Sequence, residues 1–235
     1  SSPYFNVLQL PSAADTSDKG LVRTYSAKGS QALVVGRLSH VADGSLAYSC
    51  LLYDVFSGAL EAAGEFRVSQ QQWRRAAHKC ADLVYTHATG YPGHFDTQFA
   101  LVSSAADSGN TADRLVAVDV DGASPTVLVD NGELVAMPQF RPDNRSILFI
   151  AYENDLPHLA LVELQSGRRT RLQLPPGLPS AVRFSPDGSR AILALSNDGS
   201  TDIFEYEFST ARVRRLTDTT GIDTSPSYSP DAKSI

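Results

Sequence analysis

Aspartates recur in one short motif at a fixed spacing, and they are the residues of this sequence whose pattern comes closest to a site for chemistry. Asp143, Asp187 and Asp231 each follow a proline, and successive copies lie 44 residues apart. Carboxylates that converge can bind a metal ion. Here each copy belongs to its own repeat, so the three side chains are not expected to meet. We therefore interpret these aspartates as structural residues of a repeated turn.

A second set of acids, Asp119, Glu163 and Glu207, repeats with the same spacing near the ends of predicted strands. Salt bridges to arginines such as Arg168 and Arg212 are the simpler interpretation of these acids. The histidines His40, His78, His87, His94 and His158 are scattered along the chain. The motifs G-x-S-x-G, H-E-x-x-H, C-x-x-C and the phosphate-binding loop do not occur. We expect no catalytic residue, no cofactor and no metal ligand.

The two cysteines lie in different predicted elements. Cys50 falls in a strand, and Cys80 falls on the apolar face of a helix. A disulfide requires the helix to pack on the sheet and the compartment to be oxidising. Cysteine is also among the residues most often buried in the reduced form. Both interpretations stay open at this point.

The repeated motif has a mechanical reason. In Ser185-Pro186-Asp187-Gly188 the proline fixes φ at the second turn position, and the glycine allows positive φ near the end. The aspartate side chain can accept a hydrogen bond from a backbone N–H within the turn. The aromatic residue before each turn, Phe140, Phe184 or Tyr228, is expected to pack between neighbouring repeats.

From about Phe95 the chain has only short alternating apolar runs divided by turn residues, which predicts an all-β architecture. The expected strands are Gln98–Ser103, Leu115–Val120, Thr126–Val129, Ile147–Tyr152, Leu159–Leu164, Arg169–Leu174, Ala191–Leu195, Ile203–Phe208 and Val213–Thr217. A period of 44 residues made of short strands is typical of a β-propeller, whose blades hold four strands in about 40–50 residues.

Residues 1–95 have mixed α/β character. We expect strands over Phe5–Leu10, Ala32–Leu38, Ser45–Val55 and Ala63–Val68, and a short helix over Lys19–Ala27. A longer helix should begin at Ser69 and end at Gly90. Ser69 and Gln72 have the spacing of a capping box, with Val68 and Trp73 as a hydrophobic staple. A three-stranded sheet covered by this helix is the expected first domain.

Composition excludes several classes of protein. The chain has 235 residues, a net charge of −6 and 42% hydrophobic residues, so it can form a core but does not have the basic surface of a general nucleic-acid binder. No apolar run is long enough to span a membrane. The chain begins without Met or a signal peptide and ends just after a turn. We therefore expect a fragment cut at both ends.

The repeats, together with several other segments, resemble the TolB family of the bacterial Tol–Pal system. These segments are the helix Trp73–Tyr85, the junction Thr89–Thr97, the strand Ala32–Gly36, and Arg214–Thr217 and Gly221–Pro226. The likeness extends over essentially the whole chain. The motifs at Arg141–Asn144 and Ser229–Ala232 differ from the family pattern because they lack the turn glycine.

The resemblance implies an α+β protein with a small mixed α/β N-terminal domain, residues 1–95, incomplete at its start. It is followed by part of a six-bladed β-propeller, residues 96–235, with about three blades present. It also implies a non-enzymatic periplasmic scaffold that binds Pal, the peptidoglycan-associated lipoprotein, and links to TolA. Such a scaffold supports outer-membrane integrity and constriction at cell division, and some colicins use it. The TolA-binding segment is expected to be absent from this chain.

Loops that enter the repeated turn should lie on one face of the propeller, because they are equivalent at the 44-residue period. By the resemblance and by loop position, Leu178, Ala181 and Thr224 are expected to face Pal, with Leu134, Ser180 and Ile222 beside them. Two alternatives remain. One is the gating propeller of a prolyl-oligopeptidase-like serine peptidase, which needs a hydrolase domain elsewhere. The other is a propeller that binds a sugar or a metal. An open three-blade piece should also associate or be poorly soluble, because a blade edge and an apolar face stay uncovered.

Overall fold

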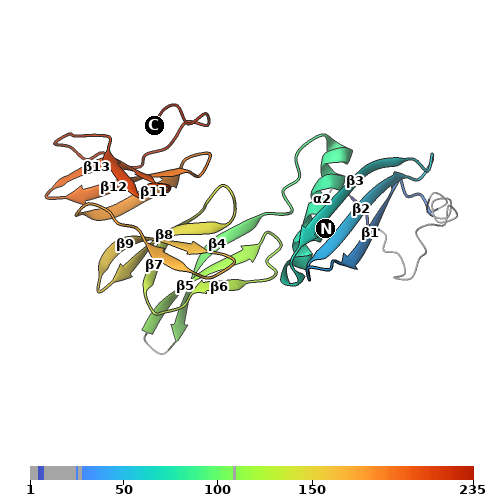
Figure 1. The fold of residues 1–235 in the computed structure, drawn as a ribbon, viewed down its shortest axis with the longest axis horizontal. Coiled ribbons are helices and arrows are strands. Elements are labelled where there is room, and N and C mark those ends of the chain that lie inside the picture. Colours follow the sequence, from blue (N-terminus) through green and yellow to red (C-terminus); the bar gives the residue numbers. More distant parts are fainter. Residues whose placement is uncertain (1–4, 8–24, 26–27, 108–109) are drawn as a thin grey trace. The chain divides into compact units, whose positions relative to one another are not determined.

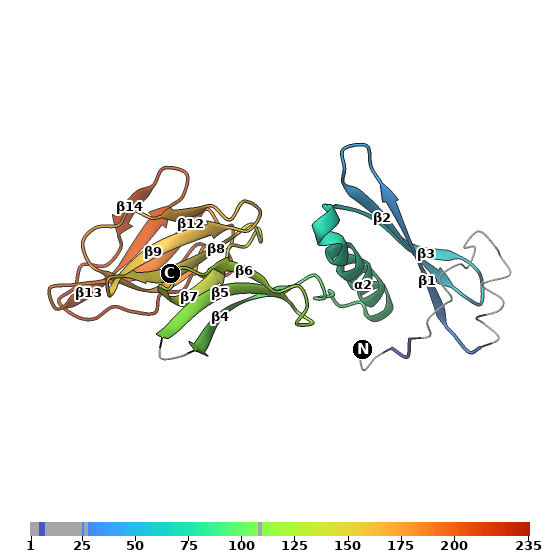
Figure 2. The ribbon, with the colours of Figure 1, turned by 90° about the horizontal axis from the view of Figure 1, so that it is seen from below.

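The computed structural model describes residues 5–7, 25, 28–107 and 110–235. The chain divides into two compact units, Ser1–Thr97 and Gln98–Ile235, and each is described by itself. Figures 1 and 2 show a helix beside a sheet in the first unit and further sheets in the second.

The first unit contains an antiparallel sheet of three strands in the order β1-β2-β3. The strands are β1 (Ala32–His40), β2 (Leu46–Asp54) and β3 (Leu60–Val68), and the helix α2 (Trp73–Thr89) contacts β2 and β3. Figure 2 shows α2 lying along one face of this sheet. Gly64 of β3 lies close to the helix: a Cβ there would lie 2.8 Å from Leu83 Cδ1, so the end of the Leu83 side chain would have to shift.

The helix ends as expected but begins differently. Gly90 adopts a left-handed φ of 75°, and its N–H donates to the carbonyl of Thr86 at 2.9 Å. The predicted capping box is wrong, because Ser69 precedes the short 3₁₀ helix η1 (Gln70–Gln72) and makes no side-chain cap hydrogen bond. Trp73 is 53% exposed, whereas Val68 packs with Leu46 and Ala76. Because of the extra 3₁₀ turn, the first residues of the helix face a different direction from the one that the predicted capping box requires.

Cys50 and Cys80 form a disulfide with a Cα–Cα distance of 5.7 Å. It joins the middle strand β2 to α2, and both residues are buried. The apolar clusters of this unit are small, each with three buried members, so the disulfide is a substantial part of what holds helix and sheet together.

Two predictions for the start of the chain fall largely outside the described residues. Of the expected strand Phe5–Leu10, residues 5–7 are described and are not in a strand, and 8–10 lie outside the description. Of the expected helix Lys19–Ala27, Tyr25 alone is described, and it is helical.

The second unit consists of three antiparallel sheets, and each follows the chain from strand to adjacent strand. The first sheet holds β4 (Gln98–Asp107), β5 (Asn110–Asp119) and β6 (Thr126–Val129). The second holds β7 (Leu134–Phe140), β8 (Ser146–Glu153), β9 (Leu156–Glu163) and β10 (Arg169–Arg171). The third holds β11 (Leu178–Phe184), β12 (Arg190–Asn197), β13 (Ser200–Glu207) and β14 (Arg212–Arg215). No helix occurs among the described residues of this unit, as the change of periodicity predicts.

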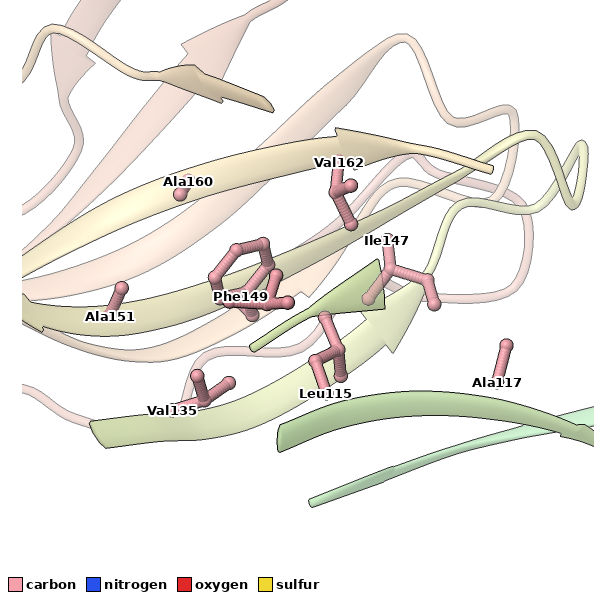
Figure 3. Packing of buried hydrophobic residues seen from close by; sticks show 9 residues of the cluster. Leu115, Ala117, Val135, Ile147, Phe149, Ala151, Ala160 and Val162 are labelled. Atoms are coloured by element: carbon pink, nitrogen blue, oxygen red, sulfur yellow. The ribbon is translucent and has the colours of Figure 1, made fainter. Parts of the chain in front are cut away.

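The sheets pack face to face through side chains at repeating positions. Figure 3 shows Leu115 and Ala117 of the first sheet against Val135, Ile147 and Phe149 of the second. The opposite face of the second sheet carries Leu148 and Ile150, which pack against Leu193 and Leu195 of the third. Since β8 is buried on both faces, it is a continuous apolar run rather than an alternating one.

The repeated turns form as the motif predicts. The carboxylates of Asp143, Asp187 and Asp231 accept hydrogen bonds from the backbone N–H two residues later at 2.9, 3.0 and 3.2 Å. The position of the turn glycine has positive φ in all three copies, 55° at Asn144, 69° at Gly188 and 56° at Ala232. The aspartates therefore shape the turns, as expected.

Candidate protein-binding face of the repeated sheets

An apolar residue is exposed at the start of β7, at the start of β11 and at the equivalent position after β14. Leu134 opens β7, Leu178 opens β11, and Ile222 takes the equivalent place after β14. They are 45%, 51% and 74% exposed, whereas the residues that follow Leu134 and Leu178 are buried. Equivalent strands of neighbouring repeats begin at the same end, so these side chains form a series along one face. Isolated exposed leucines are ordinary, but a repeated series is the kind of patch that marks a protein interface.

Three residues after each of these apolar side chains the backbone turns into the left-handed region. Met137, Ala181 and Ser225 have φ of 52°, 50° and 56°. In the second sheet Met137 and Pro138 lie opposite a single residue of β8, and in the third Ala181 and Val182 lie opposite a single residue of β12. Each is a β-bulge, which bends the strand and interrupts the ladder of hydrogen bonds. Non-glycine residues at positive φ are strained and concentrate at functional sites.

The remaining predicted residues adjoin these bulges. Ser180 immediately precedes the bulge of β11 and is partly buried, and so is Ala181. Thr224 is exposed and precedes Ser225 in the segment after β14. The six predicted residues thus fall into three groups at equivalent positions of the repeat, on β7, on β11 and on the segment after β14. The prediction that Leu134–Met137 and Leu178–Ala181 are loops is wrong, because they are the first residues of strands β7 and β11. The bulges were also missed, because Met, Ala and Ser carry no signal for positive φ.

A polar cluster that sequence reasoning also missed supports the loop before Leu134. Arg169 donates to Glu133 at 2.6 Å, lies 3.3 Å from His158 Nε2 and covers the ring of Phe149. Burial, with Arg171 and Arg169 nearby, lowers the pKa of His158 below its ordinary value. A neutral His158 can accept a hydrogen bond from Arg169. The cluster thereby fixes Glu133, the residue that leads into the exposed Leu134.

The repeated acids Asp119, Glu163 and Glu207 make their hydrogen bonds and ion pairs within their own sheets. Glu163 pairs with Arg168 and accepts a hydrogen bond from Ser166, as the salt-bridge interpretation predicts. Glu207 instead accepts from Thr210, and Asp119 accepts from Gln98. Hydrogen bonds from the Ser185 hydroxyl and from Ser189 lower the pKa of Asp187 to about 2. A carboxylate held in this way stabilises a turn and is poorly suited to transfer protons near neutral pH.

The arrangement of exposed apolar residues and β-bulges suits the docking of a protein partner. It offers apolar side chains at a regular spacing, with bent backbone beside them, on rigid sheets. In the part of the chain that the structure describes, no helix is long and apolar enough to cross a membrane.

Comparison with known proteins identifies the family to which the chain belongs. A family model described as the TolB beta propeller domain matches residues 85–235, which is more than half of the chain. The chain belongs to the TolB family. The match includes all three sheets of the second unit, which are consistent with part of a propeller.

Curated TolB relatives carry the same name from different bacteria. The chain is 35% identical over 195 residues to the Tol-Pal system protein TolB of Gluconobacter oxydans (strain 621H), covering 83% of this chain and 43% of the relative. It is 38% identical over 203 residues to that of Dinoroseobacter shibae (strain DSM 16493 / NCIMB 14021 / DFL 12), covering 85% and 46%. The chain therefore spans about half the length of these relatives.

The fold agrees with a solved TolB structure. The crystal structure of TolB from Acinetobacter baumannii aligns with a TM-score of 0.70 at 30% identity, covering 90% of this chain and 53% of the other. The four antiparallel sheets and the helix α2 of this chain are consistent with a fold that includes part of a propeller.

Proposed function

We propose that the chain is part of a periplasmic, non-enzymatic scaffold that binds the Pal lipoprotein and links it to TolA, in support of outer-membrane integrity and constriction at division. Residues 1–95 are the N-terminal α/β domain of this scaffold, and 96–235 supply three of its six blades. Membership of the TolB family supports the role in the Tol–Pal system. The Cys50–Cys80 disulfide supports an oxidising compartment such as the periplasm.

The observation that carries the Pal-binding proposal is the series of exposed apolar side chains at equivalent positions, Leu134, Leu178 and Ile222. Apolar anchors on a rigid face contribute most when a partner covers them completely. Ala181 and Thr224 lie beside these anchors, next to the bulged backbone, where a partner can also contact main-chain groups. We assign no residue of this chain to TolA or to colicins.

The test is direct binding of the soluble domain of Pal to the chain by calorimetry. Leu178→Glu places a charge in the proposed contact and should weaken binding by about tenfold or more. The matched control is Leu60→Glu in the first unit, because Leu60 and Leu178 are the same residue type and both are 51% exposed. Equal effects of the two substitutions, or no binding of Pal by the unsubstituted chain, would refute the proposed face.

A further inference from the structure

A buried carboxylate lies close to the segment that leads into the exposed Ile222. Asp202 on β13 is 5% exposed, so its side chain cannot form a substantial contact with a partner protein. At the 44-residue period its equivalents are His158 on β9 and Arg114 on β5. The three sheets of the second unit therefore each place a polar side chain at this position, although the three residues differ in charge.

The two equivalents hold the connection that enters β7. Arg114 binds the carboxylate of Asp130 at 3.1 Å. His158 lies 3.3 Å from Arg169, which binds the carboxylate of Glu133 at 2.6 Å. Asp130 and Glu133 both belong to the short connection between β6 and β7. A polar residue at this position can therefore fix a connection that ends at an exposed apolar residue, which predicts that Asp202 acts on the connection after β14.

Asp202 binds that connection directly. Its carboxylate accepts a hydrogen bond from the Thr219 N–H at 3.3 Å and another from Arg215 at 2.6 Å. The arginine supplies the opposite charge that a buried carboxylate requires. Because β13 lies between β12 and β14 in the third sheet, the carboxylate is carried by a strand that is paired on both sides. Thr219 is thereby tied to the body of the sheet.

Thr219 in turn holds the two residues that flank Ile222. Its hydroxyl accepts a hydrogen bond from the Gly221 N–H at 3.3 Å and donates to the Asp223 carboxylate at 3.0 Å. The same two residues also bind Thr201, because the Thr201 N–H donates to the Gly221 carbonyl at 3.3 Å and the Asp223 N–H donates to the Thr201 carbonyl at 2.8 Å. The backbone of Ile222 is therefore fixed on both sides, while its side chain stays 74% exposed.

The exposure of this apolar position does not depend on whether its strand is paired. Leu134 and Leu178 are 45% and 51% exposed, although β7 and β11 belong to complete four-stranded sheets. We therefore expect Ile222 to remain exposed when further strands pair with the segment that follows it. An exposed apolar side chain on a fixed backbone is a suitable anchor, because less conformational freedom is lost when a partner binds.

We propose that Asp202 is a positioning residue of the Pal-binding face: by holding Thr219 it sets the place of the Ile222 side chain. The inference rests on the proposed function for the identity of the partner. It adds a buried residue to a face whose other members lie at or near the surface. Asp202 acts through Thr219 and Ile222 and makes no contact with Pal itself.

The first measurement is amide hydrogen exchange in the free chain. Asp202→Ala removes the acceptor for the Thr219 N–H, so the amides of Gly221 and Asp223 should exchange at least about fivefold faster. Glu205→Ala is the matched control and should leave these two amides unchanged. Glu205 lies on the same strand, is 7% exposed and is likewise bound by arginines, but its printed partners Arg190, Arg214 and Tyr228 lie outside the segment 217–223. Circular dichroism should show both variants folded.

A second variant reaches the same network without touching the buried carboxylate. Thr219→Val keeps the shape of the side chain but removes the hydroxyl that binds Gly221 and Asp223. The amides of these two residues should again exchange faster than in the unsubstituted chain. If Asp202→Ala does not fold, this variant alone decides whether the network holds Ile222.

The second measurement is calorimetric binding of the soluble domain of Pal. Asp202→Ala and Ile222→Ala should each weaken binding about fivefold or more. Together they should weaken it no more than the stronger single substitution does, because both act through one anchor. Asp202→Asn should restore binding, since its amide oxygen can still accept from the Thr219 N–H. A role that depended only on the charge facing Arg215 would not be restored in this way.

The possible failures can be told apart. Unchanged exchange at Gly221 and Asp223, additive losses of Pal binding, an equal loss in Glu205→Ala, or no rescue by Asp202→Asn would each overturn the inference. If the unsubstituted chain does not bind Pal, the proposed function fails, and exchange in the free chain still decides whether Asp202 holds the segment that carries Ile222.

Discussion

The two units of the chain are stabilised by different means. The first unit has one helix on three strands, small apolar clusters and a disulfide between β2 and α2. The second has no cysteine and relies on two large apolar clusters between successive sheets. A sheet buried on both faces can hold itself by packing alone, whereas a sheet covered by a helix on one face gains more from a covalent link.

The largest effect is expected at Phe149, which lies at the centre of the cluster between the first two sheets and is fully buried. Phe149→Ala should lower the free energy of unfolding of the second unit by about 3–5 kcal/mol, because it removes buried apolar surface and leaves a cavity. Urea unfolding measures this loss. Phe99→Ala, at a position 49% exposed, is the control and should cost much less. Equal losses would mean that packing between sheets does not hold the second unit.

The next effect belongs to the disulfide. Replacing Cys50 and Cys80 with alanine should lower the stability of the first unit by about 2–4 kcal/mol, because the 30-residue loop between them is no longer closed in the unfolded state. Hydrogen exchange should then speed up in β2 and α2 and remain unchanged in β8 and β12. Faster exchange in both units to the same degree would contradict the separate stabilisation of the two.

A smaller, local effect is expected where the chain leaves the first unit. Asp82→Ala removes the acceptor for the Phe95 and Asp96 N–H groups and should cost about 1–2 kcal/mol. Exchange of those two amides should become faster than in the unsubstituted chain. Glu61→Ala breaks the exposed pair with His87 and should cost less than about 1 kcal/mol. If Asp82 did not hold the junction, Asp82→Ala would lower the stability less than Glu61→Ala does.

The smallest effect comes from the turn aspartate of the third sheet. Hydrogen bonds in the folded state lower the pKa of Asp187 to about 2. A lowered pKa means that the carboxylate stabilises the folded state above the unfolded value near 4, and that this contribution disappears as the pH falls toward 2. Asp187→Asn should reduce the pH dependence of stability in that range. A pKa near 4 for Asp187 in a carbon-13 NMR titration would contradict the turn geometry.

Local signals predicted the elements whose form depends on local chemistry. Gly90 ends the helix because glycine readily adopts the left-handed conformation, and the Pro-Asp turns close because the aspartate bonds its own backbone. The sequence did not decide whether the disulfide forms, because this depends on which face of α2 packs on β2, and tertiary packing determines that face. The bulges at Met137 and Ala181 were not predictable either, since tertiary packing and not residue type imposes their positive φ.

Hydrogen exchange on the complex with Pal tests the central claim most directly. The proposed face predicts that Pal slows exchange in three segments, Leu134–Met137, Leu178–Ala181 and Ile222–Ser225, which are one period apart. Amides of the first unit should exchange as in the free chain. Protection confined to the first unit, or to the opposite ends of the sheets at the turns Arg141–Asn144 and Ser185–Gly188, would contradict the account.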